Sequence, residues 1–349
     1  MIVFYRNRRS VAVLKCAQNG LRNHNPQERI NQNHLAKLAD EISMKPLIYT
    51  LCVVFVCLRL SAQTNVWQPS PEHTQLPIWP GAAPDAQPVP GPEYVTNVLS
   101  PGGGSWIAAC NVSLPTMTVY PPKGKNTGVA VVVFPGGGYN CLAIDLEGTE
   151  ICDWLTSRGI TAVLLKYRVP TPKREAYGGS RMALEDAQRT MGLVRFHAAE
   201  WHIDPHKIGV VRFSAGGHLV AATSTHFDKR SYPAVDAADK ASCRPDFAIA
   251  LYPGHLSAEK DEPVALNPHI RVTSKTPPTF LVQAEDDHVD GIGQVLVYYI
   301  ALKQAGVPVE MHLYAQGGHA FGLRPTKFPI TGWPQLLGKW LETIGMIPE

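Results

Sequence analysis

The chain has 349 residues, of which 45% are hydrophobic and 17% charged, with 30 prolines and 29 glycines. This composition is too apolar for a disordered protein, and the length suits one large domain with extensions. Residues 1–62 hold nine of the lysines and arginines against three acidic residues, so the formal net charge of +3 becomes −3 for the rest of the chain. The body therefore lacks the basic surface of a nucleic-acid-binding protein, and we expect no nucleic-acid partner.

An apolar run of about a dozen residues, 47–58, lies near the N-terminus between basic residues. It is too short to cross a bilayer of ~30 Å as a helix, and its flanks are typical of a secretory signal peptide at 44–62. Because the run follows Met44 directly, residues 1–43 are interpreted as an upstream extension that is not translated; a signal anchor that stays attached is the alternative. The sequence thus predicts a secreted or periplasmic protein without stable membrane insertion after signal removal.

Residues 63–104 are rich in proline and glycine, which keeps a chain extended and unhelical. We expect them to be a lead-in to a single domain at 105–349. That part of the chain has four cysteines, interpreted as buried small hydrophobic residues because no pair has metal-ligand spacing, with disulfide pairing left open: Cys110, Cys141, Cys152 and Cys243.

Strands and helices alternate after residue 128. Apolar runs predict strands at 129–134, 160–167, 208–213, 247–252, 279–284 and 309–314, and the first two are expected to be buried on both faces. Amphipathic segments predict helices at 147–158, 180–201, 293–306 and 333–344. This order predicts an α/β fold with a mostly parallel central sheet flanked by helices on both faces. A site would lie at the carboxyl ends of the strands.

The strand at 208–213 leads directly into Ser214, and helix-forming residues follow. A serine in such a turn is exposed, strained and close to the positive end of a helix dipole, as a nucleophile requires. The usual pattern for this turn is G-x-S-x-G, but Arg212 replaces its first glycine. We expect Arg212 to crowd and strain the turn, unless its side chain reaches outward to pair with a carboxylate such as Asp246.

A nucleophilic serine needs a general base that a carboxylate orients. His319 follows the last predicted strand in a short glycine-flanked loop, where that base belongs. The acid is Asp286 or Asp287, which both follow the strand at 279–284. We favour Asp286, because a D-x-x-V pattern then returns Val289 to the core, and keep Asp287 as the alternative.

A glycine-rich loop, Pro135–Tyr139, follows the first buried strand. Its glycines allow the backbone N–H groups of Gly137 or Gly138 to bind an oxyanion together with the N–H of Ala215, and we expect Tyr139 to line the substrate site. No phosphate-binding lysine follows the loop, and no metal motif is present in the sequence. The sequence therefore predicts no metal.

Seven segments occur in an order typical of one group of enzymes: PGGGY at 135–139, DAQRTMGLVR at 186–195, WHIDPHKIGV at 201–210, FSAGGHL at 213–219, SCRPDFAIALYPGHL at 242–256, AEDDHV at 284–289 and GGHAFGL at 317–323. Over about residues 100–349 the chain resembles the α/β-hydrolases, and more narrowly the secreted bacterial carbohydrate esterases that include acetylxylan and feruloyl esterases. This resemblance implies a serine esterase with Ser214 as nucleophile, His319 as base and Asp286 as acid, acting without cofactor on acylated polysaccharide or oligosaccharide.

Two alternatives stay open. A serine peptidase of the prolyl-oligopeptidase type has the same nucleophile turn, but this chain has no room for its propeller domain. A hydrolase-fold binding protein with impaired catalysis is the other, because Arg212 departs from the pattern.

Overall fold

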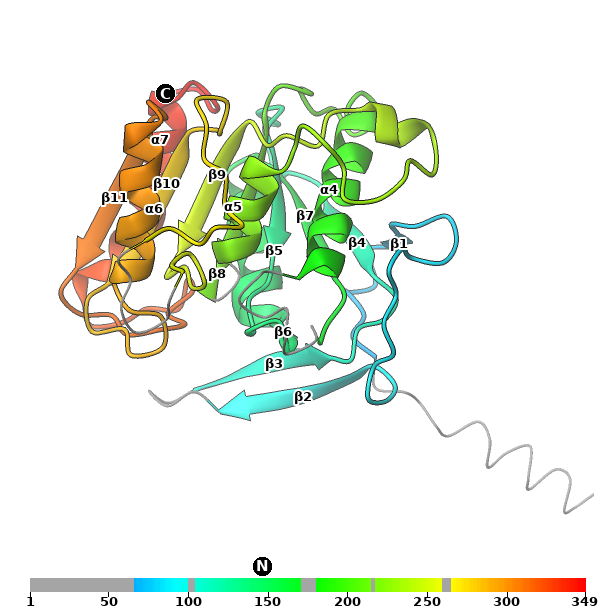
Figure 1. Cartoon of the computed structure of the whole chain (residues 1–349), viewed down its shortest axis with the longest axis horizontal. Helices are drawn as coiled ribbons and strands as arrows, with labels where there is room; N and C mark the ends of the chain where they lie inside the picture. The colour runs from blue at the N-terminus through cyan, green and yellow to red at the C-terminus, as the bar shows by residue number, and fades with distance from the viewer. Residues whose placement is uncertain (1–65, 100–103, 171–179, 215–216, 259–264) are drawn as a thin grey trace, which may run out of the picture. The chain divides into compact units, whose positions relative to one another are not determined.

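An eight-stranded sheet forms the centre of the computed structural model, which describes residues 66–99, 104–170, 180–214, 217–258 and 265–349 (Figure 1). The strand order is β1-β4-β7-β5-β8-β9-β10-β11. Neighbouring strands from β7 to β11 are parallel, whereas β4 runs antiparallel to β7 and β1 runs antiparallel to β4. The predicted α/β fold with a mostly parallel sheet is confirmed.

The parallel strands match the six apolar runs of the sequence to within one residue at either end. They are β5 (Ala130–Phe134), β7 (Thr161–Lys166), β8 (Ile208–Phe213), β9 (Phe247–Leu251), β10 (Thr279–Ala284) and β11 (Val309–Tyr314). All residues of the first five are buried, and β11 at the edge is partly exposed. The five buried strands lack polar alternation because helices cover both faces of the sheet.

Helices pack on both faces. In Figure 1, α4 (Arg181–Phe196), α5 (Gly217–Thr225) and α6 (Gly293–Gln304) lie in front of the sheet and α7 (Trp333–Thr343) lies behind it. A π-helical segment η1 (Asp145–Thr149) leads into α3 (Glu150–Ser157), whose Trp154 ring lies 6.2 Å from the Trp333 ring of α7. Short 3-10 helices occur at η4 (Ala237–Lys240) and η5 (Pro329–Gly332).

The ends of α4 follow local capping rules. Ser180, where the sequence predicts the helix to start, caps it by accepting a 3.2 Å hydrogen bond from the N–H of Ala183. The regular helix ends at Phe196, earlier than predicted, and turns continue to residue 202. The helix does not continue beyond this point, because His202 has a left-handed φ of 53° and the N–H of Ile203 donates a hydrogen bond to the carbonyl of Ala198.

The proline-rich lead-in is extended and unhelical as predicted, but it also supplies strands that the sequence did not reveal. β1 (Gln75–Pro77) pairs with β4 (Thr116–Tyr120) at the edge of the main sheet. β2 (Tyr94–Leu99) pairs with β3 (Ser105–Cys110), which pairs with β6 (Cys141–Ala143) in a second sheet. In Figure 1, β2 and β3 lie on the side toward which the arrowheads of β9 and β11 point. The lead-in is therefore part of the folded unit.

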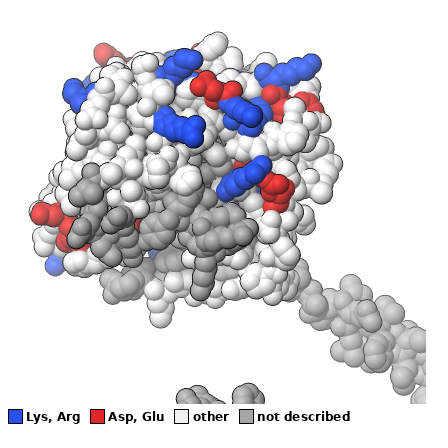
Figure 2. Space-filling model, in the orientation of Figure 1, with Lys and Arg blue, Asp and Glu red and all other residues white. Residues whose placement is uncertain are grey.

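The expected N-terminal extension and signal segment lie outside the described residues. None of the helices that the structure describes is long and apolar enough to cross a membrane. Lysine, arginine, aspartate and glutamate side chains are interspersed on the described surface in Figure 2, without separation by sign. The four cysteines after residue 63 are unpaired thiols, and only Cys141 among them is partly exposed.

Candidate active site

Ser214 lies at the carboxyl end of β8, in the strained turn that the sequence predicts. Its φ is +60°, a left-handed conformation that a residue with a Cβ rarely adopts. A 3.0 Å hydrogen bond from the N–H of Gly254 to the Ser214 carbonyl holds the turn. At Gly217, the first residue of α5, a Cβ would lie 2.1 Å from Pro253, so only glycine allows this close packing behind the serine.

His319 joins the serine to a carboxylate. Its Nε2 atom lies 2.6 Å from Ser214 Oγ, and its Nδ1 atom lies 2.7 Å from Asp287 Oδ2. A carboxylate accepts hydrogen bonds, so this contact places the imidazole proton on Nδ1 and leaves Nε2 free to accept the proton of the serine. The three side chains come from the ends of β8, β10 and β11, which the parallel sheet brings to one edge.

The choice of Asp286 as the partner of the histidine is wrong. Asp287 is the residue that contacts His319, and its side chain is fully buried. Asp287 Oδ1 also accepts hydrogen bonds from the N–H groups of Val289 (2.8 Å) and Asp290 (3.1 Å). The argument for Asp286 required Val289 to return to the core, but that side chain is 53% exposed.

Asp286 instead supports the loop that carries the histidine. Its Oδ1 accepts hydrogen bonds from the N–H groups of Gly317 (2.9 Å) and Gly318 (2.7 Å). The two carboxylates are adjacent in sequence, and only the tight turn after β10 decides which one faces His319. His288, in the same turn, is exposed and is not part of this chain of contacts.

The pKa of His319 is raised from its ordinary value. Burial alone would lower it, but the hydrogen bond and negative charge of Asp287, with the charges of Asp290 and Glu147, outweigh burial. The imidazolium form that develops when the histidine takes a proton is therefore stabilised by its surroundings. This is the electrostatic arrangement that a general base of this type needs.

The glycine loop after β5 stands beside the serine. A Cβ on Gly136 would lie 2.2 Å from Glu147 Oε2 and 3.2 Å from the Cβ of Ser214. Gly137 and Gly138 have φ angles of 122° and 63°, which glycine adopts freely. The Gly136 N–H donates to Glu147 over 2.8 Å, so it is not available to an oxyanion. Ala215, the other predicted oxyanion donor, lies outside the described residues.

Comparison with known proteins agrees with this geometry. The model of a family with the α/β-hydrolase fold matches residues 131–323, more than half of the chain. The chain belongs to the α/β-hydrolase family. A crystal structure of an acetyl ester-xyloside bifunctional hydrolase from Caldicellulosiruptor lactoaceticus is 32% identical with a TM-score of 0.61, covering 82% of this chain and 100% of that one.

Two curated proteins are also similar to this α/β-hydrolase. An acetylxylan esterase of Xylanibacter ruminicola is 30% identical over 246 residues, 65% of this chain and 48% of that protein. Endo-1,4-beta-xylanase B of Butyrivibrio fibrisolvens is 27% identical over 219 residues, 58% of this chain and 34% of that protein. The matched region thus spans about half or less of each curated relative.

The sequence did not reveal Glu147, a buried carboxylate of this α/β-hydrolase site. Besides the Gly136 N–H, Glu147 accepts a 2.8 Å hydrogen bond from the hydroxyl of Tyr252, whose ring contacts His319 edge-on with centroids 4.9 Å apart. Burial raises the pKa of Glu147, opposed by its bond to Tyr252 and by the charges of His319 and Arg212. A glutamate in a predicted helix carries no signal that it would point into the site.

The Arg212 side chain points inward and not out of the turn, and Asp246 is not its partner. Its side chain is completely buried beneath the glycine loop, and Asp246 pairs with Arg195 over 2.9 Å. The guanidinium carbon lies 4.6 Å from the centre of the Tyr139 ring. The prediction that Tyr139 lines the substrate site is also wrong, because its side chain is 1% exposed and packs beneath the loop.

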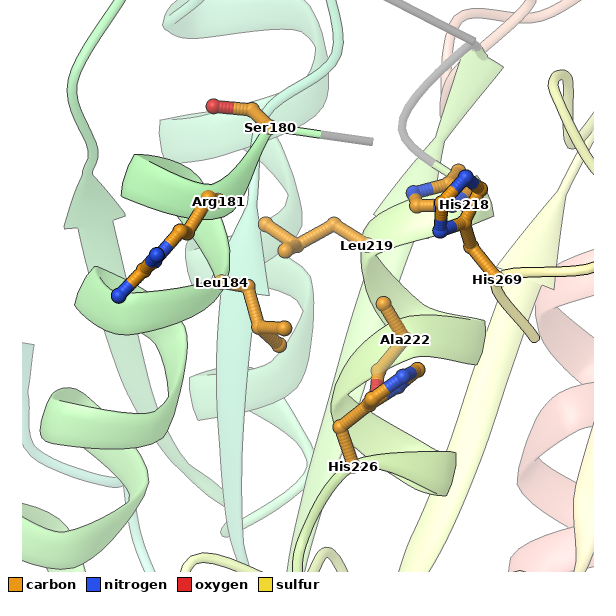
Figure 3. Close-up of a pocket in the computed structure, with 8 residues that line it drawn as sticks. All are labelled: Ser180, Arg181, Leu184, His218, Leu219, Ala222, His226 and His269. Atoms are coloured by element: carbon orange, nitrogen blue, oxygen red, sulfur yellow. The ribbon is translucent and has the colours of Figure 1, made fainter. Parts of the chain in front are cut away.

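A cavity of about 140 Å³ lies between α4 and α5. Figure 3 shows its lining, in which Leu184, Leu219 and Ala222 meet polar side chains from both helices and from a neighbouring loop: Ser180, Arg181, His218, His226 and His269. Burial and nearby positive groups lower the pKa of His218 to about 3, so it is neutral at physiological pH. Within the described ranges, no cluster of three His, Cys, Asp or Glu side chains could hold a metal.

Proposed function

We propose that this protein is a serine esterase that cleaves carboxylic esters through an acyl-enzyme. The observation that carries the proposal is the continuous chain of contacts from Ser214 Oγ through His319 to the buried Asp287. The strained serine turn and the raised pKa of His319 support the same function. The name of the acetylxylan esterase of X. ruminicola agrees with it.

In the proposed reaction, Ser214 Oγ attacks the ester carbonyl while His319 Nε2 takes the serine proton. The carbonyl oxygen becomes an oxyanion, which the N–H groups of Gly137 or Gly138 and of Ala215 would stabilise. As the tetrahedral intermediate collapses, the alcohol leaves with the proton from His319 and the acyl group stays on the serine. Water then attacks the acyl-enzyme and gives a proton to His319, which passes that proton to Ser214 Oγ as the bond to the acyl group breaks and the carboxylic acid leaves.

We propose an acetyl group on a xylan-type polysaccharide or oligosaccharide as the substrate. Two relatives have names that include an acetyl ester or acetylxylan activity. The cavity between α4 and α5 has hydroxyl, imidazole and guanidinium groups, which hydrogen-bond sugar hydroxyls, and no Phe, Tyr or Trp in its lining. A feruloyl ring, which aromatic side chains would bind better, fits this lining less well.

Export is part of the proposal, supported by the apolar run at 47–58 that follows Met44 and Lys45. N-terminal sequencing of the protein recovered outside the cytoplasm tests it. Cleavage near residue 62 is the expected result, and an intact N-terminus in the cytoplasm would contradict export.

The esterase activity is tested with the wild-type protein and Ser214→Ala on p-nitrophenyl acetate, acetylated xylan, methyl ferulate and a proline-containing peptide. We expect the wild type to act on the two acetyl esters and Ser214→Ala to lose turnover by about a thousandfold or more, since the serine forms the acyl intermediate. Retention of more than about a tenth of wild-type turnover by the variant would remove Ser214 from the mechanism. Cleavage of the peptide would favour the peptidase. No hydrolysis of any substrate would favour the binding protein.

A further inference from the structure

Arg212 is a fully buried arginine next to the nucleophile. It lies on β8 at the centre of the sheet, paired with Phe134 of β5 on one side and Ala250 of β9 on the other. Within the described chain, its Nε and Nη1 atoms have no hydrogen-bond partner. Moving a charged guanidinium out of water costs free energy, so its surroundings must provide compensating interactions.

The compensation comes from two tyrosines. The Arg212 guanidinium carbon lies 4.6 Å from the centre of the Tyr139 ring and 4.8 Å from that of the Tyr167 ring. Cation–π contacts of this kind stabilise a cation more strongly when it is removed from water. Arg212 Nη2 also donates a 2.6 Å hydrogen bond to the hydroxyl of Tyr167.

These contacts reach both ends of the glycine loop. The Tyr167 hydroxyl, which accepts from Arg212, donates a 2.6 Å hydrogen bond to the carbonyl of Pro135, the first residue of the loop. Tyr139, whose ring covers the guanidinium, is the last residue of the loop and has a φ of +58°. The segment between them carries the N–H groups of Gly137 and Gly138. One buried side chain thus fixes the start and the end of the predicted oxyanion-binding loop.

We propose that Arg212 is a positioning residue that holds the loop Pro135–Tyr139 in the shape required to bind the oxyanion. This inference rests on the proposed esterase function. Arg212 holds the start of the loop through the hydrogen bond of the Tyr167 hydroxyl to Pro135, and it holds the end of the loop through its contact with the Tyr139 ring. The positive charge also lies beneath a site where negative charge develops, in surroundings that screen it weakly. Arginine at this position is therefore a functional replacement for the usual glycine.

The test uses Tyr167→Phe, which removes the hydroxyl without changing the ring, and Arg212→Met, which removes the charge and the hydrogen bond but keeps much of the volume. Tyr298→Phe, at a buried tyrosine of α6, is the matched control. Four quantities are measured on each folded variant: kcat and KM on p-nitrophenyl acetate, the inhibition constant of a trifluoromethyl ketone, whose serine adduct carries an oxyanion, and the melting temperature.

We expect Tyr167→Phe to lower kcat and weaken ketone binding by about tenfold each, and Arg212→Met by about a hundredfold, because oxyanion stabilisation is lost in both measurements. KM should stay within about twofold, and Tyr298→Phe should stay within about twofold in all constants. If Arg212→Met does not fold, the constants of Tyr167→Phe alone test the proposed role of Arg212.

Wild-type kcat and ketone binding in folded Tyr167→Phe would overturn the proposal. A parallel loss in Tyr298→Phe would also overturn it, because the effect would then be general to buried tyrosines. The variant Ser214→Ala distinguishes a failure of the esterase proposal from a failure of the proposed role of Arg212. If that variant retains turnover, the esterase mechanism fails; if it is inactive while Tyr167→Phe is unchanged, only the role of Arg212 fails.

Discussion

At the scale of single residues, the adjacent carboxylates of Asp286 and Asp287 have different roles. Asp287 is buried and faces the imidazole of His319, while Asp286 accepts from two backbone N–H groups of the loop that carries the histidine. Both lie in one turn after β10, one residue apart. Their roles therefore differ through side-chain direction and not through residue type.

Asp287→Asn should lower kcat far more than Asp286→Asn. An amide at 287 can donate to His319 Nδ1 and so favours the wrong tautomer, for which a loss of about a thousandfold or more is expected. An amide at 286 keeps an oxygen that can accept from Gly317 and Gly318, so we expect a loss of less than about tenfold. Steady-state kinetics of the two variants decides the ranking, and the reverse order would return the acid role to Asp286.

The activity of the wild type should rise with pH through the pKa of His319. The imidazole must be neutral to accept the serine proton, and its raised pKa keeps it protonated to higher pH than an ordinary histidine. The acid limb of kcat/KM should therefore have its midpoint above the ordinary value of about 6.5. His218, with its pKa lowered to about 3, does not contribute to this limb.

The residual activity of Asp287→Asn provides the control for that assignment. Without the hydrogen bond and charge of Asp287, burial lowers the pKa of His319, so the midpoint should move to lower pH. An unchanged midpoint in that variant would mean that another group titrates.

At the scale of elements, the glycine loop fits between η1 and the serine turn without spare space. Glu147 of η1 and the backbone of Phe213 both stand where a side chain on Gly136 would go, at 2.2 and 2.7 Å from a Cβ. The position of η1 thus sets the position of the loop.

Gly136→Ala should damage both stability and catalysis. The added methyl group must displace Glu147 or the backbone at Phe213, and overpacking of this kind costs about 1–3 kcal/mol. We expect a lower melting temperature, together with a fall in kcat of about tenfold or more as the loop shifts. Gly81→Ala, where a Cβ meets nothing within 4 Å, is the matched control and should change neither quantity. Wild-type kinetics in Gly136→Ala would show that the loop adapts.

At the scale of the whole molecule, hydrogen bonds attach the lead-in to helix α4. The Trp79 indole N–H donates over 2.8 Å to the buried Asp186 of α4, and Arg189 of the same helix donates over 2.8 Å to the carbonyl of Ile78. Asp186 also pairs with Arg168, which follows β7. The lead-in therefore contributes to the core and is not a simple tether.

Trp79→Ala should lower the free energy of unfolding by about 3–5 kcal/mol, since it removes a large buried side chain and leaves Asp186 with one fewer donor. Urea unfolding measures this change. Leu114→Ala, at a side chain that is 75% exposed, is the control and should change stability by less than about 0.5 kcal/mol. Because the Trp79 ring contacts Asp186, Arg189 and Tyr232, none of which touches the triad in the described contacts, kcat of the folded variant should stay within about twofold of wild type. A stability change below about 1 kcal/mol would mean that the lead-in only rests on the surface.

The sequence by itself determined the six parallel strands, the order of strands and helices, and the pairing of Ser214 with His319. These features have local or topological signals: continuous apolar runs, a serine between a strand and a helix, and a histidine after the last strand of a parallel sheet. Tertiary structure alone decided between Asp286 and Asp287, gave Arg212 its place between two tyrosines, and brought Glu147 and the lead-in strands into the fold. Each of these depends on side-chain directions or on pairing between distant segments, which composition and periodicity do not record.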